Sequence, residues 1–528
     1  MNRELSQPSS ARGPGSTAAA WLACFVVTGG LYFFTCQRGV GWQDSALFQW
    51  RVVTGDYQGR LGLALSHPLY VAAGQVVLWL AGENLPRALS FFSGIGMAAA
   101  LANLMCVVTL LTGRRWVGLA IAGMLAVAHT PWWLATSVKT EAWAVTGLTA
   151  ELWLLIGLVR RPRWGLLAAL ALVSGLDWTV HNFALLPLPI YVGTALWLVV
   201  RKKLPAWSMA VAGGAYILGA SLYLVMIVRY ALETGSIEGA ISSALWGNYR
   251  ENVLNAKQTS AYFKENAALT AMNFVGVLGP LAAVGWARMK PRLGGPMTWI
   301  LGAITLVEAG FFVRYSVPDQ FLFGLPTLFM MALAAGIGLN VVCELSPRWR
   351  TGAVVACAGS MILAPVFYAA APHLAAWVRP GALRHRNLPY RDEARYWLVP
   401  WKQDEDSADR FAREAFAQAG SVAVIVPDVA VARLLGAYGK IHPECAGVTV
   451  QVVGAPLPAY DRKPVEFRRV LGDRPLFVTM YENNPAAQAM ARDAAFDQKP
   501  GEMLCRVIWK AAGTQTAPAP SGAKVDTK

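Results

Sequence analysis

Three polar side chains suited to proton transfer follow the first long apolar stretch of the chain, residues 18–35. Asp44 and Ser45 lie among aromatic residues, and His67 follows after a short polar loop. A carboxylate can accept a proton from a hydroxyl group, and burial beside aromatic rings makes it a stronger base. We expect Asp44 to be a general base, with Ser45 and His67 in contact with a substrate. A second interpretation also fits, because Asp is a common helix N-cap and a His-Pro pair can begin a membrane-embedded helix.

Four more polar residues stand near the ends of later apolar stretches: Glu141, His181, Arg314 and Asp319. Arg314 suits bidentate binding of a phosphate, although an arginine at a membrane surface also extends toward lipid headgroups. Glu141 opens an apolar stretch, where stabilisation of a helix N-terminus explains it equally well. We expect these four residues to bind substrate beside Asp44.

The composition is that of a membrane protein. Hydrophobic residues make up 55% of the 528 positions, and charged residues only 15%, against about 25% in soluble domains. Apolar stretches long enough to cross a bilayer recur along the chain. The net charge of +15 is concentrated in short loops between these stretches, which argues against a nucleic-acid partner.

Five short loops carry Lys or Arg and no acidic residue, which predicts that they face the cytoplasm. They are Arg114-Arg115, Arg160-Arg161-Pro-Arg163, Arg201-Lys202-Lys203, Arg288-Met-Lys290-Pro-Arg292 and Arg348-Trp-Arg350. This assignment predicts about eleven transmembrane helices. It also places the N-terminus inside and the site residues outside, provided that the short stretch 68–82 is an interfacial or re-entrant helix.

The domain boundaries follow from changes in composition. Residues 1–17 are predicted to be a disordered cytoplasmic tail, and residues 18–371 a transmembrane domain with an outer loop at 36–87. Alternating strand and helix patterns predict a small extracytoplasmic α/β domain at 374–510. Residues 511–528 are a predicted disordered tail.

The sequence supports no cofactor. It contains no CxxC spacing and no Gly-rich phosphate loop. No residue pattern indicates a divalent metal site either, although the sequence does not exclude one. Cys445 and Cys505 would be able to pair outside the cytoplasm, and the sequence leaves this open. Glu151 and Glu308 fall inside apolar stretches, where acids usually face a cavity or a partner.

Several short motifs, taken in order, resemble the protein O-mannosyltransferase-like membrane proteins of the GT-C glycosyltransferase superfamily. They are Trp42-x-Asp44-Ser45-x-x-Phe48, His67-Pro68, Trp133 followed by Glu141-Ala-Trp143, Gly175…His181-Asn182, and Tyr315-Ser-Val-Pro-Asp319…Pro326. The resemblance implies a GT-C-like helical fold, a polyprenyl-phosphate sugar donor and Asp44 as the acidic catalytic residue of the first outer loop. The chain departs from the family pattern at Leu47, where family members usually have Glu, and at Leu69-Tyr70 after His67-Pro68.

We therefore expect an inverting glycosyltransferase of the bacterial inner membrane. It would transfer a sugar from a polyprenyl-phosphate donor to a hydroxyl group of a glycan, lipid or protein outside the cytoplasm. The alternative is a lipid or glycan transporter, or a scaffold of cell-envelope assembly, without catalysis. A transporter would show internal repeats and broken helices at mid-membrane, and the sequence shows no repeat.

Overall fold

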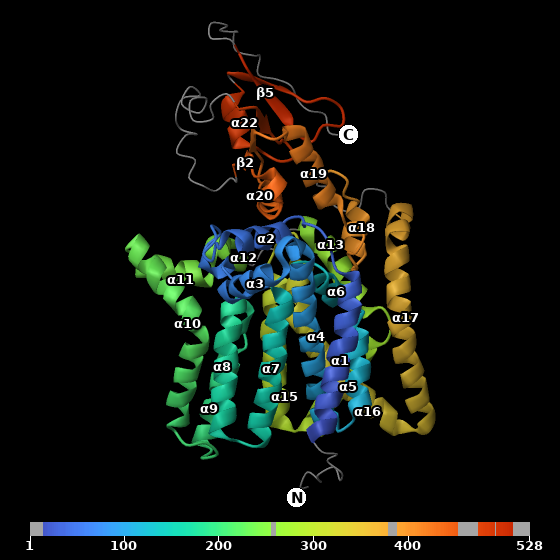
Figure 1. Cartoon of the computed structure of the whole chain (residues 1–528). Helices are drawn as coiled ribbons and strands as arrows, with labels where there is room; N and C mark the ends of the chain where they lie inside the picture. Colours follow the sequence, from blue (N-terminus) through green and yellow to red (C-terminus); the bar gives the residue numbers. More distant parts are fainter. Residues whose placement is uncertain (1–13, 255–259, 379–387, 452–473, 492, 511–528) are drawn as a thin grey trace, which may run out of the picture. The chain divides into compact units, whose positions relative to one another are not determined.

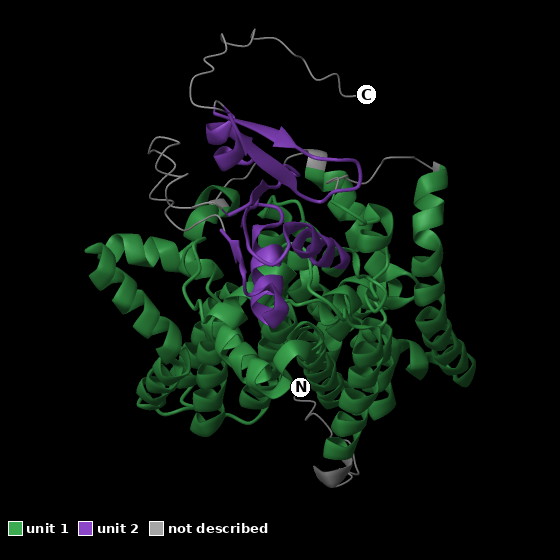
Figure 2. Cartoon of the chain, turned by 45° about the horizontal axis from the view of Figure 1, so that its top comes forward, with its two compact units in different colours: residues 1–409 green, residues 410–528 purple. Residues whose placement is uncertain are grey.

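A computed structural model describes residues 14–254, 260–378, 388–451, 474–491 and 493–510. The chain divides into two compact units, Met1–Asp409 and Arg410–Lys528 (Figure 2). The predicted tails at residues 1–17 and 511–528 lie outside the described residues, except that residues 14–17 belong to the first helix.

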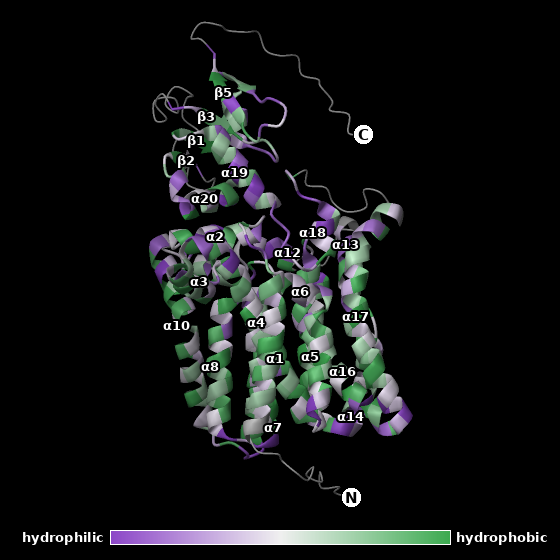
Figure 3. Cartoon of the chain, turned by 45° about the vertical axis from the view of Figure 1, so that its right-hand side comes forward, coloured by the Kyte–Doolittle hydropathy of each residue, from purple (hydrophilic) through white to green (hydrophobic). Residues whose placement is uncertain are grey.

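The first unit is a bundle of apolar α-helices. Eight helical segments within the described residues are long and apolar enough to cross a membrane, or up to ten if each of two bent helix pairs is one span. Counting the shorter apolar helix α8 (Trp164–Val180) as well reaches the predicted number of about eleven. Hydrophobic residues run along the helices and hydrophilic residues gather toward their ends (Figure 3). The chain is therefore an integral membrane protein.

Helices account for almost all regular structure in this unit, because backbone groups in lipid must be hydrogen-bonded within their own segment. In chain order the longer helices are α1 (Pro14–Thr35), α2 (Asp44–Thr54), α3 (Pro68–Ala81), α4 (Leu85–Thr112), α5 (Arg115–Ala126), α6 (His129–Ala135), α7 (Glu141–Arg160), α8 (Trp164–Val180), α9 (Leu188–Val200), α10 (Ser208–Thr234), α11 (Ile237–Leu245), α12 (Arg250–Leu254), α13 (Ser260–Ala271), α14 (Leu278–Leu293), α15 (Gly295–Arg314), α16 (Leu325–Leu345), α17 (Pro347–Val378) and α18 (Glu393–Leu398). Short 3₁₀ turns follow several of them, including η3 (Asn182–Leu185) and η6 (Gln320–Gly324).

Two short helices, α2 and α3, lie across the upper end of the bundle in Figure 1. They pack against one another, and Gly74 permits the close approach: a Cβ atom there would lie 2.5 Å from Cγ2 of Val52. The 14 residues of α3 give about 21 Å of helix, which is shorter than a bilayer core of about 30 Å. Its interfacial or re-entrant placement stays a prediction.

The second unit contains a five-stranded sheet in the order β2-β1-β3-β5-β4. Its strands are β1 (Ala423–Val426), β2 (Val448–Val450), β3 (Leu476–Val478), β4 (Ala494–Asp497) and β5 (Cys505–Trp509). β1 pairs in parallel with β2 and β3, whereas β5 runs antiparallel to β3 and β4. Helices α20 (Ala432–Ile441) and α22 (Pro485–Met490) complete the unit, while α19 (Ser407–Ala419) crosses the boundary between the units. The predicted small α/β fold is confirmed, and Cys445 and Cys505 are both buried free thiols.

Candidate active site

Asp44 is the first residue of α2, and its carboxylate forms an ion pair with Lys139, from the loop between α6 and α7. The Nζ atom of Lys139 lies 2.6 Å from Oδ2 of Asp44. The side chain of Asp44 is 45% exposed, whereas that of Lys139 is only 5% exposed. The pair therefore presents a carboxylate at the surface and keeps its ammonium group inside.

Lys139 is the centre of a wider acidic cluster. Burial acts to lower the pKa of its ammonium group, but the negative charges of Asp44, Glu141 and Asp319 raise that pKa above its usual range. Lys139 therefore stays protonated, and residues from three distant segments meet around it. Within the described part of the chain, no three His, Cys, Asp or Glu side chains are placed to hold a metal ion.

The rings of His67 and His181 lie side by side, tilted by 31°, with their centroids 4.9 Å apart. Nδ1 of His67 lies 2.7 Å from the carbonyl oxygen of Val180, so this nitrogen donates. Nδ1 of His181 accepts from the backbone N–H of Phe183 at 3.1 Å, which leaves the proton of a neutral ring on Nε2. Burial lowers the pKa of His67 to about 4 and that of His181 well below its usual value. Both rings are neutral at pH 7, and they offer one acceptor and one donor nitrogen.

Ser45 is buried next to Asp44 on the same helix, whereas Arg314 is exposed at the end of another helix. Ser45 is buried directly after Asp44, and its hydroxyl donates to the carbonyl oxygen of Val138 at 3.4 Å. This contact is a second link between α2 and the loop that carries Lys139. Arg314 is exposed at the last position of α15, five residues before Asp319.

The loop between α2 and α3 is held by the buried guanidinium group of Arg51. It donates to three backbone carbonyl oxygens, those of Asp56 at 2.9 Å, Tyr57 at 2.6 Å and Leu65 at 2.9 Å. Three carbonyls on one planar cation fix the path of the loop that ends at His67.

Comparison with known structures shows the class of the fold. No protein-family model and no curated protein matches the sequence. The crystal structure of ArnT from Cupriavidus metallidurans bound to undecaprenyl phosphate superimposes with a TM-score of 0.55 at 10% identity, over 95% of this chain and 99% of that one. The apo state of the same protein gives 0.56 at 12% identity, over 93% and 98%. The fold is GT-C-like.

The Archaeoglobus fulgidus oligosaccharyltransferase tethered to an acceptor peptide is a more distant GT-C structure. It matches with a TM-score of 0.49 at 10% identity, over 93% of this chain and 74% of that one. At these identities the likeness to ArnT concerns the fold.

Inside the GT-C-like bundle, three buried carboxyl groups from three different helices surround a cavity of about 10 Å³. They belong to Glu151, Asp177 and Glu308. The hydroxyl of Tyr191 donates to Oε2 of Glu151 at 2.9 Å, whereas Oε1 of Glu151 and Oδ1 of Asp177 have no hydrogen-bond partner among the described residues. A cavity of this size holds about one water molecule.

Two residues with structural roles at the site were missed from the sequence. Lys139 was assigned no role from the sequence, although its position two residues before Glu141 was a usable signal. Arg51 was not singled out, because an arginine in a short amphipathic helix gives no indication that it will bind three carbonyl groups.

Proposed function

We propose that this GT-C-like protein is a membrane glycosyltransferase that transfers a sugar from a polyprenyl-phosphate donor to an acceptor hydroxyl group. The observation that carries the proposal is the half-exposed carboxylate of Asp44 on a buried ammonium group, at one end of a helical bundle with the fold of ArnT. In an ion pair the carboxylate is ionised, which is the form that accepts a proton.

The reaction we propose is a single inverting displacement. The acceptor oxygen attacks the anomeric carbon while Asp44 takes the hydroxyl proton, and the bond between that carbon and the phosphate oxygen breaks. The electron pair leaves with the polyprenyl phosphate. One carboxylate is sufficient for this displacement, so Leu47 is compatible with activity.

The surrounding residues have supporting roles in this proposal. Arg314 binds the leaving phosphate, while the neutral rings of His67 and His181 give hydrogen bonds. Ser45, Glu141 and Asp319 complete the substrate contacts. Residues 374–510 position a glycan, lipid or protein acceptor, and the O-mannosyltransferase-like motifs make that subfamily the one we favour.

We infer the orientation from the basic loops. Helix α7 begins at Glu141, beside the site, and ends at Arg160 in one of these loops. Its 20 residues span about 30 Å, so this loop lies at the opposite end of the bundle from Asp44. With basic loops in the cytoplasm, the site faces the outside of the bacterial inner membrane and the N-terminus faces the cytoplasm.

The test measures sugar transfer from a labelled polyprenyl-phosphate hexose by the purified full chain. Wild type is compared with Asp44→Asn at equal amounts of folded protein. Asp56→Asn is a matched control, since Asp56 lies in the loop that follows α2 and its Oδ1 accepts from Gly59 N at 2.8 Å. We expect transfer or slow donor hydrolysis with wild type and Asp56→Asn, and a loss of about 100-fold or more with Asp44→Asn. Donor binding without turnover in all three proteins would instead support a lipid carrier or an assembly scaffold.

A further inference from the structure

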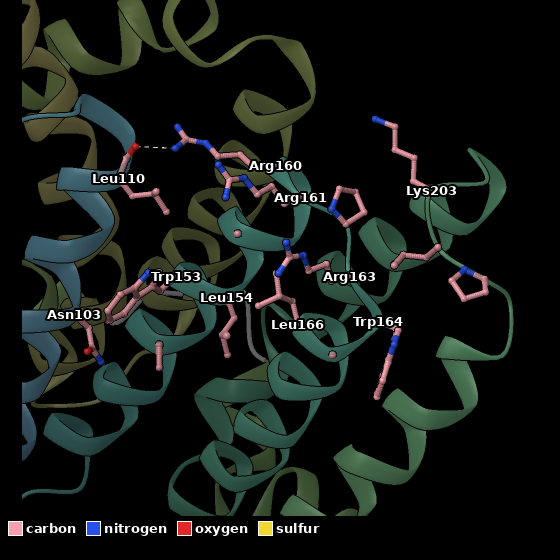
Figure 4. A pocket seen from close by; sticks show the side chains of 16 residues that line it. Asn103, Leu110, Trp153, Leu154, Arg160, Arg161, Arg163, Trp164, Leu166 and Lys203 are labelled. Carbon is pink, nitrogen blue, oxygen red and sulfur yellow. Dashed lines mark hydrogen bonds between the residues drawn. The ribbon is translucent and has the colours of Figure 1, made fainter. Parts of the chain in front are cut away.

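A large cavity opens at the end of the bundle opposite the candidate active site. Its volume is about 1350 Å³, which exceeds the roughly 300–1,000 Å³ of most small-ligand sites. It lies between the end of α7, the start of α8 and the loop that follows α9 (Figure 4). Because α7 spans the bilayer between the two places, this cavity is separate from the site around Asp44.

The residues that line the cavity are largely apolar and include several cations. Trp153, Leu154 and Leu166 line it, and Figure 4 shows these side chains within one hollow. Four cations also line it, Arg160, Arg161, Arg163 and Lys203, and no described lining residue is acidic.

The arginine side chains are placed for an anionic headgroup. Nη1 of Arg160 donates to the carbonyl oxygen of Leu110 at 2.7 Å, which ties this side chain to the end of α4. Arg161 and Arg163 are exposed on either side of Pro162. Guanidinium groups bind phosphate oxygens in a bidentate manner, so these two residues are suited to one phosphate group.

We propose that this cavity binds one glycerophospholipid with an anionic headgroup. One acyl chain lies along Trp153, Leu154 and Leu166, while the phosphate contacts Arg161 and Arg163. Excess positive charge favours an anionic over a zwitterionic headgroup, and the apolar walls have no role in binding a free inorganic phosphate. This lipid site is separate from the proposed glycosyltransferase activity, and the proposal holds whether or not the protein transfers a sugar.

Cationic loops at one membrane face also follow from topology alone, and the chain provides a control for that explanation. Arg348 and Arg350 are exposed in another basic loop at the start of α17, and neither lines the cavity. The pair Arg348→Gln/Arg350→Gln removes the same charge as Arg161→Gln/Arg163→Gln and leaves the cavity unchanged.

A second variant tests the apolar part without changing charge. Gly165 lines the cavity in the first turn of α8, and a Cβ atom built there meets nothing within 4 Å. Gly165→Leu therefore fills the cavity without a clash at the backbone.

The measurement is native mass spectrometry of the purified full chain with added phosphatidylglycerol or phosphatidylcholine. We expect wild type to retain one phosphatidylglycerol in preference to phosphatidylcholine. Retention of phosphatidylglycerol should fall about tenfold or more in Arg161→Gln/Arg163→Gln. It should also fall in Gly165→Leu. In the control pair Arg348→Gln/Arg350→Gln it should stay within about twofold of wild type.

Three results would overturn the proposal. They are equal retention of the two lipids, an equal loss in the control pair, and displacement of phosphatidylglycerol by polyprenyl phosphate at equimolar amounts. The last would make the cavity a donor-lipid site. Monodisperse elution of each variant, measured in parallel, ensures that a misfolded protein is not counted.

Discussion

The ammonium group of Lys139 lies 2.6 Å from the carboxylate of Asp44, although 95 positions separate the two residues in sequence. This contact joins the start of α2 to the loop before α7. It holds the half-exposed negative charge of Asp44 against the buried positive charge of Lys139. We regard it as the interaction that fixes where Asp44 stands.

Replacing Lys139 should therefore cost both stability and activity. Lys139→Gln leaves Glu141 and Asp319 beside Asp44 without their shared cation. We expect a loss of about 1–3 kcal/mol in the free energy of unfolding, less than the 3–5 kcal/mol of a fully buried pair because water screens Asp44. Transfer activity should fall by about tenfold or more, since Asp44 is no longer held. Thermal unfolding and the transfer assay measure the two effects.

Lys264→Gln is the control for this change, because Lys264 is an exposed cation on α13 and should be neutral. A double-mutant cycle of Lys139→Gln with Asp44→Asn should show non-additive stability losses. Strict additivity would mean that the two side chains do not stabilise one another.

Much of the bundle was predictable because hydrophobicity and charge are local in the sequence. Apolar stretches of the right length predict helices that cross a membrane, and basic loops predict which ends share a face. Asp44, Glu141 and Asp319 were expected at one face on that basis, and the structure brings them together around Lys139.

The remaining features depend on contacts between distant segments. The convergence of Glu151, Asp177 and Glu308 on one cavity follows from how three helices pack, which periodicity does not reveal. The rings of His67 and His181, 4.9 Å apart between centroids, come from segments that are distant in the sequence, and His67 has a left-handed backbone with φ of 45°. The apolar stretches around Glu151 and Glu308 indicated that each acid faces a cavity or a partner, but not that the two share one with Asp177. The contact between the two histidine rings has no signal in their neighbouring residues.

Acid should destabilise the protein through the two histidines. The pKa of His67 is about 4 when folded and about 6.5 when unfolded, so the unfolded state binds more protons between these values. Stability from this group is present above pH 6.5 and is lost as the pH falls toward 4, by about 3 kcal/mol in total. His181 acts in the same direction.

Thermal unfolding between pH 7.5 and 4.5 tests this expectation. His67→Asn should make the curve less steep, and Asn tolerates the left-handed backbone at this position. Identical pH dependence in wild type and His67→Asn would contradict the burial of this imidazole.

Arg51→Lys should loosen the loop before α3 even though the charge is kept. A lysine lacks the planar guanidinium group that donates to three carbonyl oxygens at once, so at least one of these carbonyl oxygens loses its donor. We expect a loss of about 1–3 kcal/mol and faster hydrogen exchange at residues 56–65. Arg38→Lys, at an exposed position, should change neither measurement. Unchanged exchange in Arg51→Lys would show that other contacts hold the loop.

Gly147→Ala should be strongly destabilising for a reason specific to Asp177. A Cβ atom at Gly147 would lie 2.1 Å from Cγ of Asp177, so α7 and α8 must separate or the carboxyl group must leave its place. We expect a loss of about 1–3 kcal/mol in the free energy of unfolding, measured by thermal unfolding.

Gly193→Ala is the control for this change. A Cβ atom there meets nothing within 4 Å, so this variant should be neutral. Asp177→Ala removes the clashing atom, so the double variant Gly147→Ala/Asp177→Ala should be more stable than the sum of the two losses predicts. If Gly147→Ala unfolds at the wild-type temperature, the carboxyl group of Asp177 does not occupy the space beside α7.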